Sequence, residues 1–288
     1  MRRINLIWIV LCFALITGRC MGQSVFCYST YEIRIPVAEG DSAQGLLFCP
    51  QGKHPCGGWP AVLLLHDHGA YYALGAQKFR DKKWLDKFYD GQYIADTLAA
   101  HGYVVLTLDA RYWGERRSLL SQRDYYDSLR GEWYELTLRD DRASVDYLCR
   151  LPYVNPHRIA ACGFSMGAYR AWQLAAEDRR IKVCCAANWM TTLAQNRQNE
   201  SWLSMRRPKM DSVEFYTIAS RIYPRAFLLQ YGKQDHLFPV NAVDSCVQNI
   251  HQSYYKKTTR FEAKGYDAKH CFTRQHMADW LVFLKNQL

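Results

Sequence analysis

The segment from Arg158 to Ala176 constrains the fold of this chain more than any other. It begins with a short apolar run, Ile159 to Cys162, of the length expected for a buried strand. It then passes through Gly-Phe-Ser-Met-Gly at 163–167 into a stretch whose apolar residues recur at helical spacing. A strand that turns into a helix over Gly-x-Ser-x-Gly lifts the serine, here Ser165, clear of the sheet edge. The alternative is an ordinary strand-to-helix turn made of small and apolar residues.

Strands and helices alternate along most of the remaining chain. Two segments in which apolar and polar residues alternate, Tyr31 to Pro36 and Gln44 to Cys49, predict an antiparallel pair. Further strands are predicted at Ala61 to Leu65, Tyr103 to Leu108, Ile181 to Ala187, Ala226 to Tyr231 and Thr259 to Ala263. Helices are predicted at 92–100, 132–149 and 168–176, twice within 190–222, after Asp235, and at the C-terminus. The order predicts an α/β fold with a mostly parallel central sheet, antiparallel N-terminal strands and helices on both faces.

The first 22 residues have the pattern of a secretory signal peptide. Arg2 and Arg3 precede an apolar run from Ile4 to Ile16, and small and polar residues follow through Gly22. The apolar run is shorter than the roughly 20 residues that cross a membrane, and no later stretch approaches that length. We therefore expect a secreted or periplasmic protein with no stable membrane span, whose residues 23–288 form one α/β domain.

The positive charge of the chain does not indicate nucleic-acid binding. Removal of the first 22 residues takes away three arginines and no acidic residue, so the net charge falls from +10 to +7. The lysines and arginines are scattered rather than gathered in a stripe, which gives no support for a nucleic-acid interface. A small-molecule or glycan substrate is the partner we expect, and the sequence does not define an oligomeric state.

Cysteine usage allows disulfides without specifying them. Nine cysteines follow the signal segment, so at least one thiol is unpaired. Cys49 and Cys56 bracket a turn-rich loop and are a candidate bridge, whereas the apolar surroundings of Cys162, Cys184 and Cys185 predict core residues. Cys20 offers a site for lipidation, although Arg19 before it argues against one. No Cys-x-x-Cys pair occurs, so structural zinc is not expected.

A serine nucleophile needs a base and a carboxylate, and both are available downstream of Ser165. His270 follows the final predicted strand in a loop, which makes it the best placed histidine to accept the serine proton. Asp235 ends the preceding strand in a Gly-x-x-Asp turn and supplies a carboxylate in the order Ser, Asp, His. Asp267, three residues from His270, is the competing carboxylate. The predicted catalytic group is therefore Ser165, Asp235 and His270.

Two backbone N–H groups are needed where negative charge develops on the reacting carbonyl. One is expected from Met166, at the start of the helix that follows Ser165. The second is expected from the loop after Leu65, where we assign it to His68, with Asp67 and Gly69 as alternatives. These are backbone roles, so the identity of the side chain says little about them.

The pair His66 and His68 also permits a metal site. His-x-His after a buried strand opens several metallohydrolase sites. Such a site needs further ligands at neighbouring strand ends, where Asp109, Asn188 and Asp235 stand. It would also require the Gly-x-Ser-x-Gly turn to be accidental, so we predict no metal.

Together these motifs resemble the α/β-hydrolase superfamily over roughly residues 30 to 288. Within it, the stretch LLLHDHG and the segment from Asp109 to Arg116 resemble the branch that contains dienelactone hydrolases and acetyl xylan esterases. True dienelactone hydrolases carry cysteine where this chain has Ser165, so the resemblance implies ordinary esters rather than lactones. Lipase-type relatives have HGGG where this chain has HDHG. The resemblance implies a Ser-His-Asp acyl-enzyme mechanism with no cofactor.

Aromatic and basic residues after the strand ends are candidates for substrate contact. The aromatic ones are Tyr71, Tyr72, Tyr112, Trp113 and Trp189, and the basic ones are Arg111 and Arg116. Aromatic faces suit sugar rings and arginine suits a carboxylate, so we assign substrate binding to Arg111, Trp113 and Trp189. The alternative for each is packing of its loop. With the resemblance, this predicts removal of acyl or methyl ester groups from carbohydrate.

Two other functions remain open at this point. A serine peptidase of the prolyl-oligopeptidase type would have a similar catalytic domain, although no segment long enough for a propeller precedes this one. A glycan-binding protein without catalytic activity could use the same scaffold. The presence of Ser165, Asp235 and His270 together argues against that second alternative.

Overall fold

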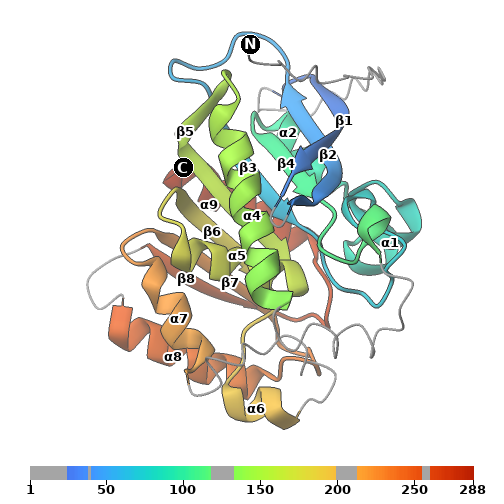
Figure 1. Ribbon diagram of the computed structural model, residues 1–288. Helices are drawn as coiled ribbons and strands as arrows, with labels where there is room; N and C mark the ends of the chain where they lie inside the picture. The colour runs from blue at the N-terminus through green and yellow to red at the C-terminus, as the bar shows by residue number, and fades with distance from the viewer. Residues whose placement is uncertain (1–24, 38–39, 118–132, 199–212, 255–259) are drawn as a thin grey trace.

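The computed structural model describes residues 25–37, 40–117, 133–198, 213–254 and 260–288. The predicted signal peptide, including Cys20, and most of the long segment after Arg116 lie outside these ranges. One eight-stranded sheet runs through the molecule in the order β1-β2-β4-β3-β5-β6-β7-β8 (Figure 1). The strands are β1 (Tyr28–Pro36), β2 (Ser42–Pro50), β3 (Trp59–Leu65), β4 (Val104–Leu108), β5 (Val154–Phe164), β6 (Ile181–Ala187), β7 (Ala226–Gly232) and β8 (Phe261–Tyr266).

The strand directions match the sequence prediction. β1 pairs with β2, and β2 with β4, in antiparallel registers, while β4, β3, β5, β6, β7 and β8 are parallel to their neighbours. The carboxyl ends of the parallel strands therefore lie along one edge of the sheet. Every candidate catalytic residue follows one of these ends.

Helices cover both faces of the sheet because the central strands are apolar on both sides. In β3, Ala61, Leu63 and Leu65 pack into one core and Val62 and Leu64 into the other. The first core is closed by α4 (Trp133–Arg150), α5 (Met166–Glu177), α7 (Phe215–Ala219) and α8 (Val240–Tyr254). The second is closed by α1 (Lys82–Phe88), α2 (Ile94–Ala100) and α9 (Arg274–Gln287) (Figure 1). Short helical segments are η2 (Ala76–Phe79), η3 (Gly114–Arg116), α6 (Leu193–Gln198) and η6 (Ser220–Ile222).

Some predicted boundaries were wrong. The last strand continues to Tyr266, three residues beyond the predicted end at Ala263, because pairing with β7 extends from Phe227 to Gly232. Sheet pairing here overrides the weak strand preference of Gly265. The charged stretch from Lys78 to Asp90, for which no element was predicted, includes the end of η2 and all of α1. Asp81 caps α1, since its side chain accepts a hydrogen bond from the Trp84 backbone N–H at 2.8 Å.

The cysteine predictions had mixed outcomes. Cys49 and Cys56 are both free thiols, so the candidate bridge between them is not formed. Burial in an apolar setting raises the pKa of Cys49 to about 11, which keeps this thiol protonated. Cys162, Cys184 and Cys185 are fully buried in the sheet, as predicted. Among the helices that the structure describes, none is long and apolar enough to cross a membrane.

Candidate active site

Ser165 stands at a sharp turn between β5 and α5. Its backbone has φ 56° and ψ −125°, a sparsely populated conformation for a residue with a side chain. The two flanking glycines make this turn possible. A methyl group at Gly167 would collide with the carbonyl oxygen of Leu65, and one at Gly163 would collide with the backbone of Gly167. The turn therefore holds the serine at the end of β5, close against β3.

The structure brings together Ser165, His270 and Asp235. The Ser165 Oγ lies 2.9 Å from Nε2 of His270, and Nδ1 of the same ring lies 2.6 Å from Oδ2 of Asp235. The three residues follow β5, β8 and β7, so the parallel sheet places them at one edge although they are far apart in sequence. Hydrogen-bonded contacts of this kind connect a nucleophile, a base and an orienting carboxylate.

Two phenylalanine rings contact the His270 ring, in addition to the polar contacts at its two nitrogens. Phe164 lies on one part of its surface, with ring centroids 5.0 Å apart and planes at 36°. Phe238 lies 5.7 Å away at 34°. The imidazole keeps a side-chain exposure of 12%, whereas Asp235 is 1% exposed. The base can therefore reach a substrate while its partner remains shielded from water.

Asp235 is fixed by hydrogen bonds to both of its oxygens. Oδ1 accepts from the backbone N–H groups of Leu237 at 2.9 Å and Phe238 at 3.3 Å. Oδ2 accepts from Asn188 Nδ2 at 3.2 Å in addition to its contact with His270. The competing carboxylate, Asp267, is exposed and accepts instead from Gln234 at 2.5 Å. The structure thus places the carboxylate of Asp235, and not that of Asp267, against His270.

The groups that orient Asn188 were not predicted from the sequence. Asn188 follows β6, the strand between those that carry Ser165 and Asp235, and its Oδ1 lies 3.0 Å from Nε2 of His276. The backbone N–H of Thr273 donates to Nδ1 of His276 at 3.1 Å, so the ring proton must be on Nε2. His276 therefore donates to Asn188 Oδ1, which turns the amide nitrogen of Asn188 toward Asp235. Burial lowers the pKa of His276 to about 3, which keeps this ring neutral.

The two predicted backbone donors follow neighbouring strands, β5 and β3. Met166 is the first residue of α5, and the first bond of this helix runs from Tyr169 N–H to the carbonyl of Ser165 at 3.1 Å. The N–H of Met166 precedes that bond, so it has no partner within the helix. His68 lies in the loop after β3, whose last residues pair with the end of β5. Both positions fit the predicted roles, and neither role depends on the side chain.

The two histidines of the possible metal site are engaged with protein groups. His66 is fully buried, its Nε2 accepts from the Ala110 N–H at 3.0 Å, and its Nδ1 lies 2.9 Å from the Asp67 carbonyl. His68 accepts from the Ala70 N–H at Nδ1, and its Nε2 lies 2.8 Å from the Tyr72 hydroxyl. Within the described ranges, no group of three or more His, Cys, Asp or Glu side chains could hold a metal ion.

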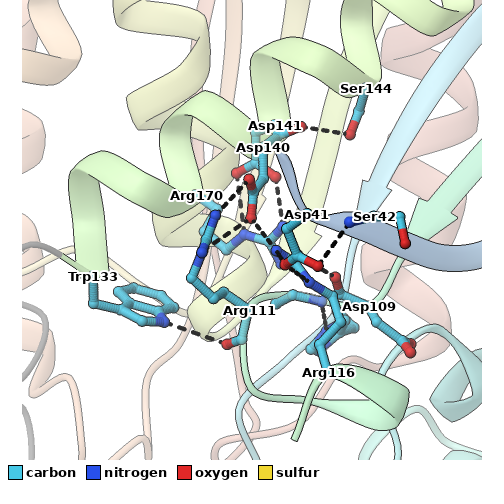
Figure 2. A network of polar contacts seen from close by, with 12 residues as sticks. Asp41, Ser42, Asp109, Arg111, Arg116, Trp133, Asp140, Asp141, Ser144 and Arg170 are labelled. Atoms are coloured by element: carbon cyan, nitrogen blue, oxygen red, sulfur yellow. Dashed lines mark hydrogen bonds and ion pairs between the residues drawn. The ribbon is translucent and has the colours of Figure 1, made fainter. Parts of the chain in front are cut away.

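Arg111 is paired with a carboxylate of the protein itself. Figure 2 shows its guanidinium directed at Asp140 of α4, with Nη2 at 3.0 Å from Oδ1. Arg116 shares the same carboxylate at 2.8 Å, and Trp133 donates to the Arg111 carbonyl. These contacts tie the loop after β4 to α4. The prediction that Arg111 contacts substrate therefore has no support in its position.

Trp113 and Trp189 are also packed inside the protein. Both have an exposure of 0%. Trp113 stacks on Tyr72 with ring centroids 4.9 Å apart, and Trp189 packs against Tyr169 and Phe215. Loop packing, the alternative left open by the sequence, describes these two residues better than substrate contact.

A cavity of about 570 Å³ lies beside the end of β4. Its lining includes Gln77, Asp109, Glu115 and Arg117, and it contains none of Ser165, Asp235 and His270. The cavity is therefore separate from the hydrogen-bonded group at the end of β5. We do not assign the reacting ester to it.

Known proteins share this sequence pattern and this fold. Residues 45–281 match the model of the dienelactone hydrolase family. YtaP of Bacillus subtilis (strain 168), which carries the name of a hydrolase, is 29% identical over 207 residues, covering 69% of this chain and 67% of YtaP.

Two solved structures show the same fold. The acetyl xylan esterase from Paenibacillus sp. R4 superposes with a TM-score of 0.66 at 18% identity, covering 98% of this chain and 88% of that one. A Klebsiella pneumoniae subsp. pneumoniae MGH 78578 protein that bears the name dienelactone hydrolase superposes with a TM-score of 0.63 at 16% identity, covering 90% and 98%. The fold is thus that of the α/β-hydrolases, as predicted. Because the family model spans most of the sequence, this chain belongs to the dienelactone hydrolase family of hydrolases.

Proposed function

We propose that this protein is a serine carboxylic ester hydrolase in which Ser165 is the nucleophile. The contacts from Ser165 to His270 and from His270 to Asp235 carry the proposal, because they connect an alcohol, a base and a carboxylate in hydrogen-bonding geometry. The serine rather than cysteine at the family's nucleophile position favours ordinary esters over lactones.

The mechanism follows from these contacts. The Ser165 Oγ attacks the ester carbonyl while Nε2 of His270 takes its proton, and Asp235 stabilises the imidazolium that forms. The carbonyl oxygen becomes an oxyanion bound by the N–H groups of Met166 and His68. Collapse of the tetrahedral intermediate breaks the bond to the leaving alcohol, which takes the proton from His270. Water then attacks the acyl-enzyme by the same route, releasing the acid and restoring Ser165.

A carbohydrate ester is the substrate class we favour. An acetyl xylan esterase shares the fold, although that likeness shows the fold alone. Among the aromatic residues that are candidates for substrate contact, Tyr71 has an exposure of 49% and follows His68 by three residues. One face of its ring stacks on Trp84 at 5.8 Å and 25°. A tyrosine supported in this way can present its other face to a sugar ring.

A substrate panel tests the proposal. We expect wild type to hydrolyse p-nitrophenyl acetate, and to release acetate or methanol from esterified xylan at a higher rate. It should not cleave Ala-Pro dipeptide anilides. Ser165→Ala should lower kcat by about 10⁴-fold or more. Ser144→Ala, which removes another buried serine hydroxyl from α4, is the matched control and should retain activity.

Each outcome separates the alternatives. Wild type that cleaves the chromogenic acetate but no glycan ester would remove the carbohydrate part, while cleavage of the anilide would support a peptidase. A protein that binds glycan, cleaves no ester and does not react with a fluorophosphonate at Ser165 would be the non-catalytic scaffold.

We also propose export of the protein, with a mature chain that begins at Gln23. The pattern of residues 1–22 supports this proposal. The N-terminal sequence of protein recovered from the periplasm or medium tests it, and recovery of the full-length chain in the cytoplasm would contradict it.

A further inference from the structure

Lys78 is a fully buried lysine that the proposed chemistry does not use. It lies in η2 with an exposure of 0%. Its Nζ donates to the backbone carbonyl of Asp67 at 2.6 Å and to that of His68 at 2.8 Å. Burying an ammonium group is costly unless it is paired and hydrogen-bonded. The ammonium group is therefore part of a specific arrangement around the His68 loop.

The surroundings of Lys78 hold the ammonium group in place. The carboxylate of Asp67 lies 3.5 Å from Nζ, and the ring of Trp84 lies 4.7 Å from it. Asp67 is itself fixed, since Oδ1 accepts from Trp84 Nε1 at 3.0 Å and from the Tyr89 hydroxyl at 2.7 Å. Burial lowers the pKa of Lys78 to about 8, so the lysine remains largely charged at neutral pH.

Lys78 contacts two successive carbonyls, together with His66 Nδ1 at the Asp67 carbonyl and Trp113 Nε1 at the His68 carbonyl. In a trans peptide the N–H points opposite to the C=O. Because the carbonyls of Asp67 and His68 both point at Nζ, the N–H groups of His68 and Gly69 point away from it. Successive N–H groups on one side of a loop form an anion-binding concavity. Gly69 adopts φ +54°, and a side chain there would collide with Trp84.

This loop lies beside the candidate nucleophile. It continues from β3, whose last residue, Leu65, pairs with Gly163 at the end of β5. Gly167, in the turn between β5 and α5, packs directly on the carbonyls of Leu65 and His66. The N–H groups of the loop and that of Met166 therefore belong to neighbouring strand ends.

We propose that Lys78 is a positioning residue that sets the second half of the oxyanion hole, by holding the carbonyls of Asp67 and His68 so that the N–H groups of His68 and Gly69 face the reacting carbonyl. This inference rests on the proposed ester hydrolysis at Ser165. Lys78 touches no substrate. Its effect falls on the transition state, where the oxyanion is present, and not on binding of the ester.

The test compares Lys78→Met with the double variant Lys78→Met/Asp67→Asn. The double variant is needed because the single one leaves the Asp67 carboxylate buried opposite an apolar side chain. Lys82→Met, at an exposed lysine of α1, is the matched control. Circular dichroism and Tm establish that each variant is folded. kcat and KM for p-nitrophenyl acetate are measured beside the inhibition constant of octylthio-trifluoropropanone, a ketone that forms an oxyanion on the serine.

We expect kcat of the folded variants to fall about 10- to 100-fold, with KM within about threefold of wild type. The inhibition constant of the ketone should rise by the same factor as kcat falls. The inference is overturned if kcat of the folded double variant stays within about threefold of wild type, or if kcat falls without weaker ketone binding.

A measurement on the unmodified protein stands beside the variants. Binding of the ketone to wild type should shift the amide proton resonance of His68 or Gly69 downfield, and no shift at either amide would overturn the inference whatever the variants do. Failure of wild type to cleave any ester or to bind the ketone would refute the proposed function instead. Active wild type with equally active variants refutes only the role of Lys78.

Discussion

Asn188 donates a hydrogen bond from Nδ2 to Oδ2 of Asp235 at 3.2 Å, the same carboxylate oxygen that lies 2.6 Å from His270. The amide of Asn188 can make this contact in only one orientation, which the neutral His276 fixes from the other side. The carboxylate is consequently oriented by a chain of contacts that begins at the backbone of Thr273. Such supporting contacts set the geometry of a base at the level of a few tenths of an ångström.

We expect Asn188→Gly to lower kcat for a small ester about 10-fold while leaving KM nearly unchanged. Glycine accepts the φ of +56° found at this position, so the substitution removes the amide without adding backbone strain. Oδ2 of Asp235 would then lose the donor that fixes it, and the position of His270 would be less well defined. Steady-state kinetics give the split between kcat and KM.

Asn249→Gly provides a comparison for Asn188→Gly. It removes an amide from α8 that donates to the Ser245 carbonyl. It should lower stability without a specific loss of kcat. An unchanged kcat in folded Asn188→Gly would show that the hydrogen bonds from Leu237 and Phe238 suffice to hold Asp235.

The candidate catalytic group could be predicted from the sequence because each member follows a strand. The flanking glycines indicated Ser165, and the order along the chain and the positions after β7 and β8 indicated Asp235 and His270. Residues that follow the carboxyl ends of parallel strands lie along one edge of the sheet, regardless of how the helices pack. The choice between Asp235 and Asp267 needed coordinates, since both follow neighbouring strand ends.

The supporting groups could not be predicted from local patterns. Lys78 lies in a charged stretch typical of a solvated surface, yet the fold buries it against carbonyls ten and eleven residues earlier. His276 was one polar residue in an amphipathic helix, and its partner Asn188 is 88 residues away. Trp113 and Trp189 carry no sequence signal that separates packing from binding. Contacts with other parts of the chain, both hydrogen bonds and ring packing, decided these roles.

The turn at Ser165 gives a prediction about stability. Gly167→Ala should destabilise the protein by about 3 kcal/mol or more, because the added methyl group collides with the Leu65 carbonyl and the backbone of β3 cannot move aside. Gly52→Ala places a methyl group in open space, at a residue whose φ is +99°, and should lower the free energy of unfolding by only about 1 kcal/mol. Urea unfolding measures the free energy of unfolding of the two variants. Equal losses would show that the turn at Ser165 tolerates the added methyl group.

Arg111 gives a prediction that separates structural support from substrate binding. Arg111→Met should lower the free energy of unfolding by about 1 to 3 kcal/mol, because the buried carboxylate of Asp140 loses its ion pair with Arg111. KM should change equally for a neutral ester and for one that carries a carboxylate. Arg34→Met, at an arginine paired with Glu115 on the surface, is the control and should cost less than about 1 kcal/mol. A rise in KM confined to the carboxylate ester would restore Arg111 as a substrate-binding residue.

Buried neutral histidines should make the protein sensitive to mild acid. Burial lowers the pKa of His276 to about 3 and that of His68 to about 4, whereas both rings titrate near 6.5 in the unfolded chain. Below pH 6.5 the unfolded chain therefore binds protons that the folded protein cannot, and stability falls as the pH is lowered. Protonation of each ring in the unfolded chain should lower the free energy of unfolding by about 2 kcal/mol between pH 7 and pH 5.

His276→Gln isolates one of these contributions, since glutamine keeps a donor for Asn188 but takes up no proton. Between pH 7 and pH 5, the free energy of unfolding measured in urea should fall by about 2 kcal/mol less in this variant than in wild type. His54→Gln removes an exposed histidine and should leave the loss as in wild type. If the stability of His276→Gln falls as much as that of wild type over this interval, then His276 takes up a proton in the folded protein at pH 5. The ring could not then accept the hydrogen bond from Thr273 at that pH, and the pKa of His276 would not be lowered by burial.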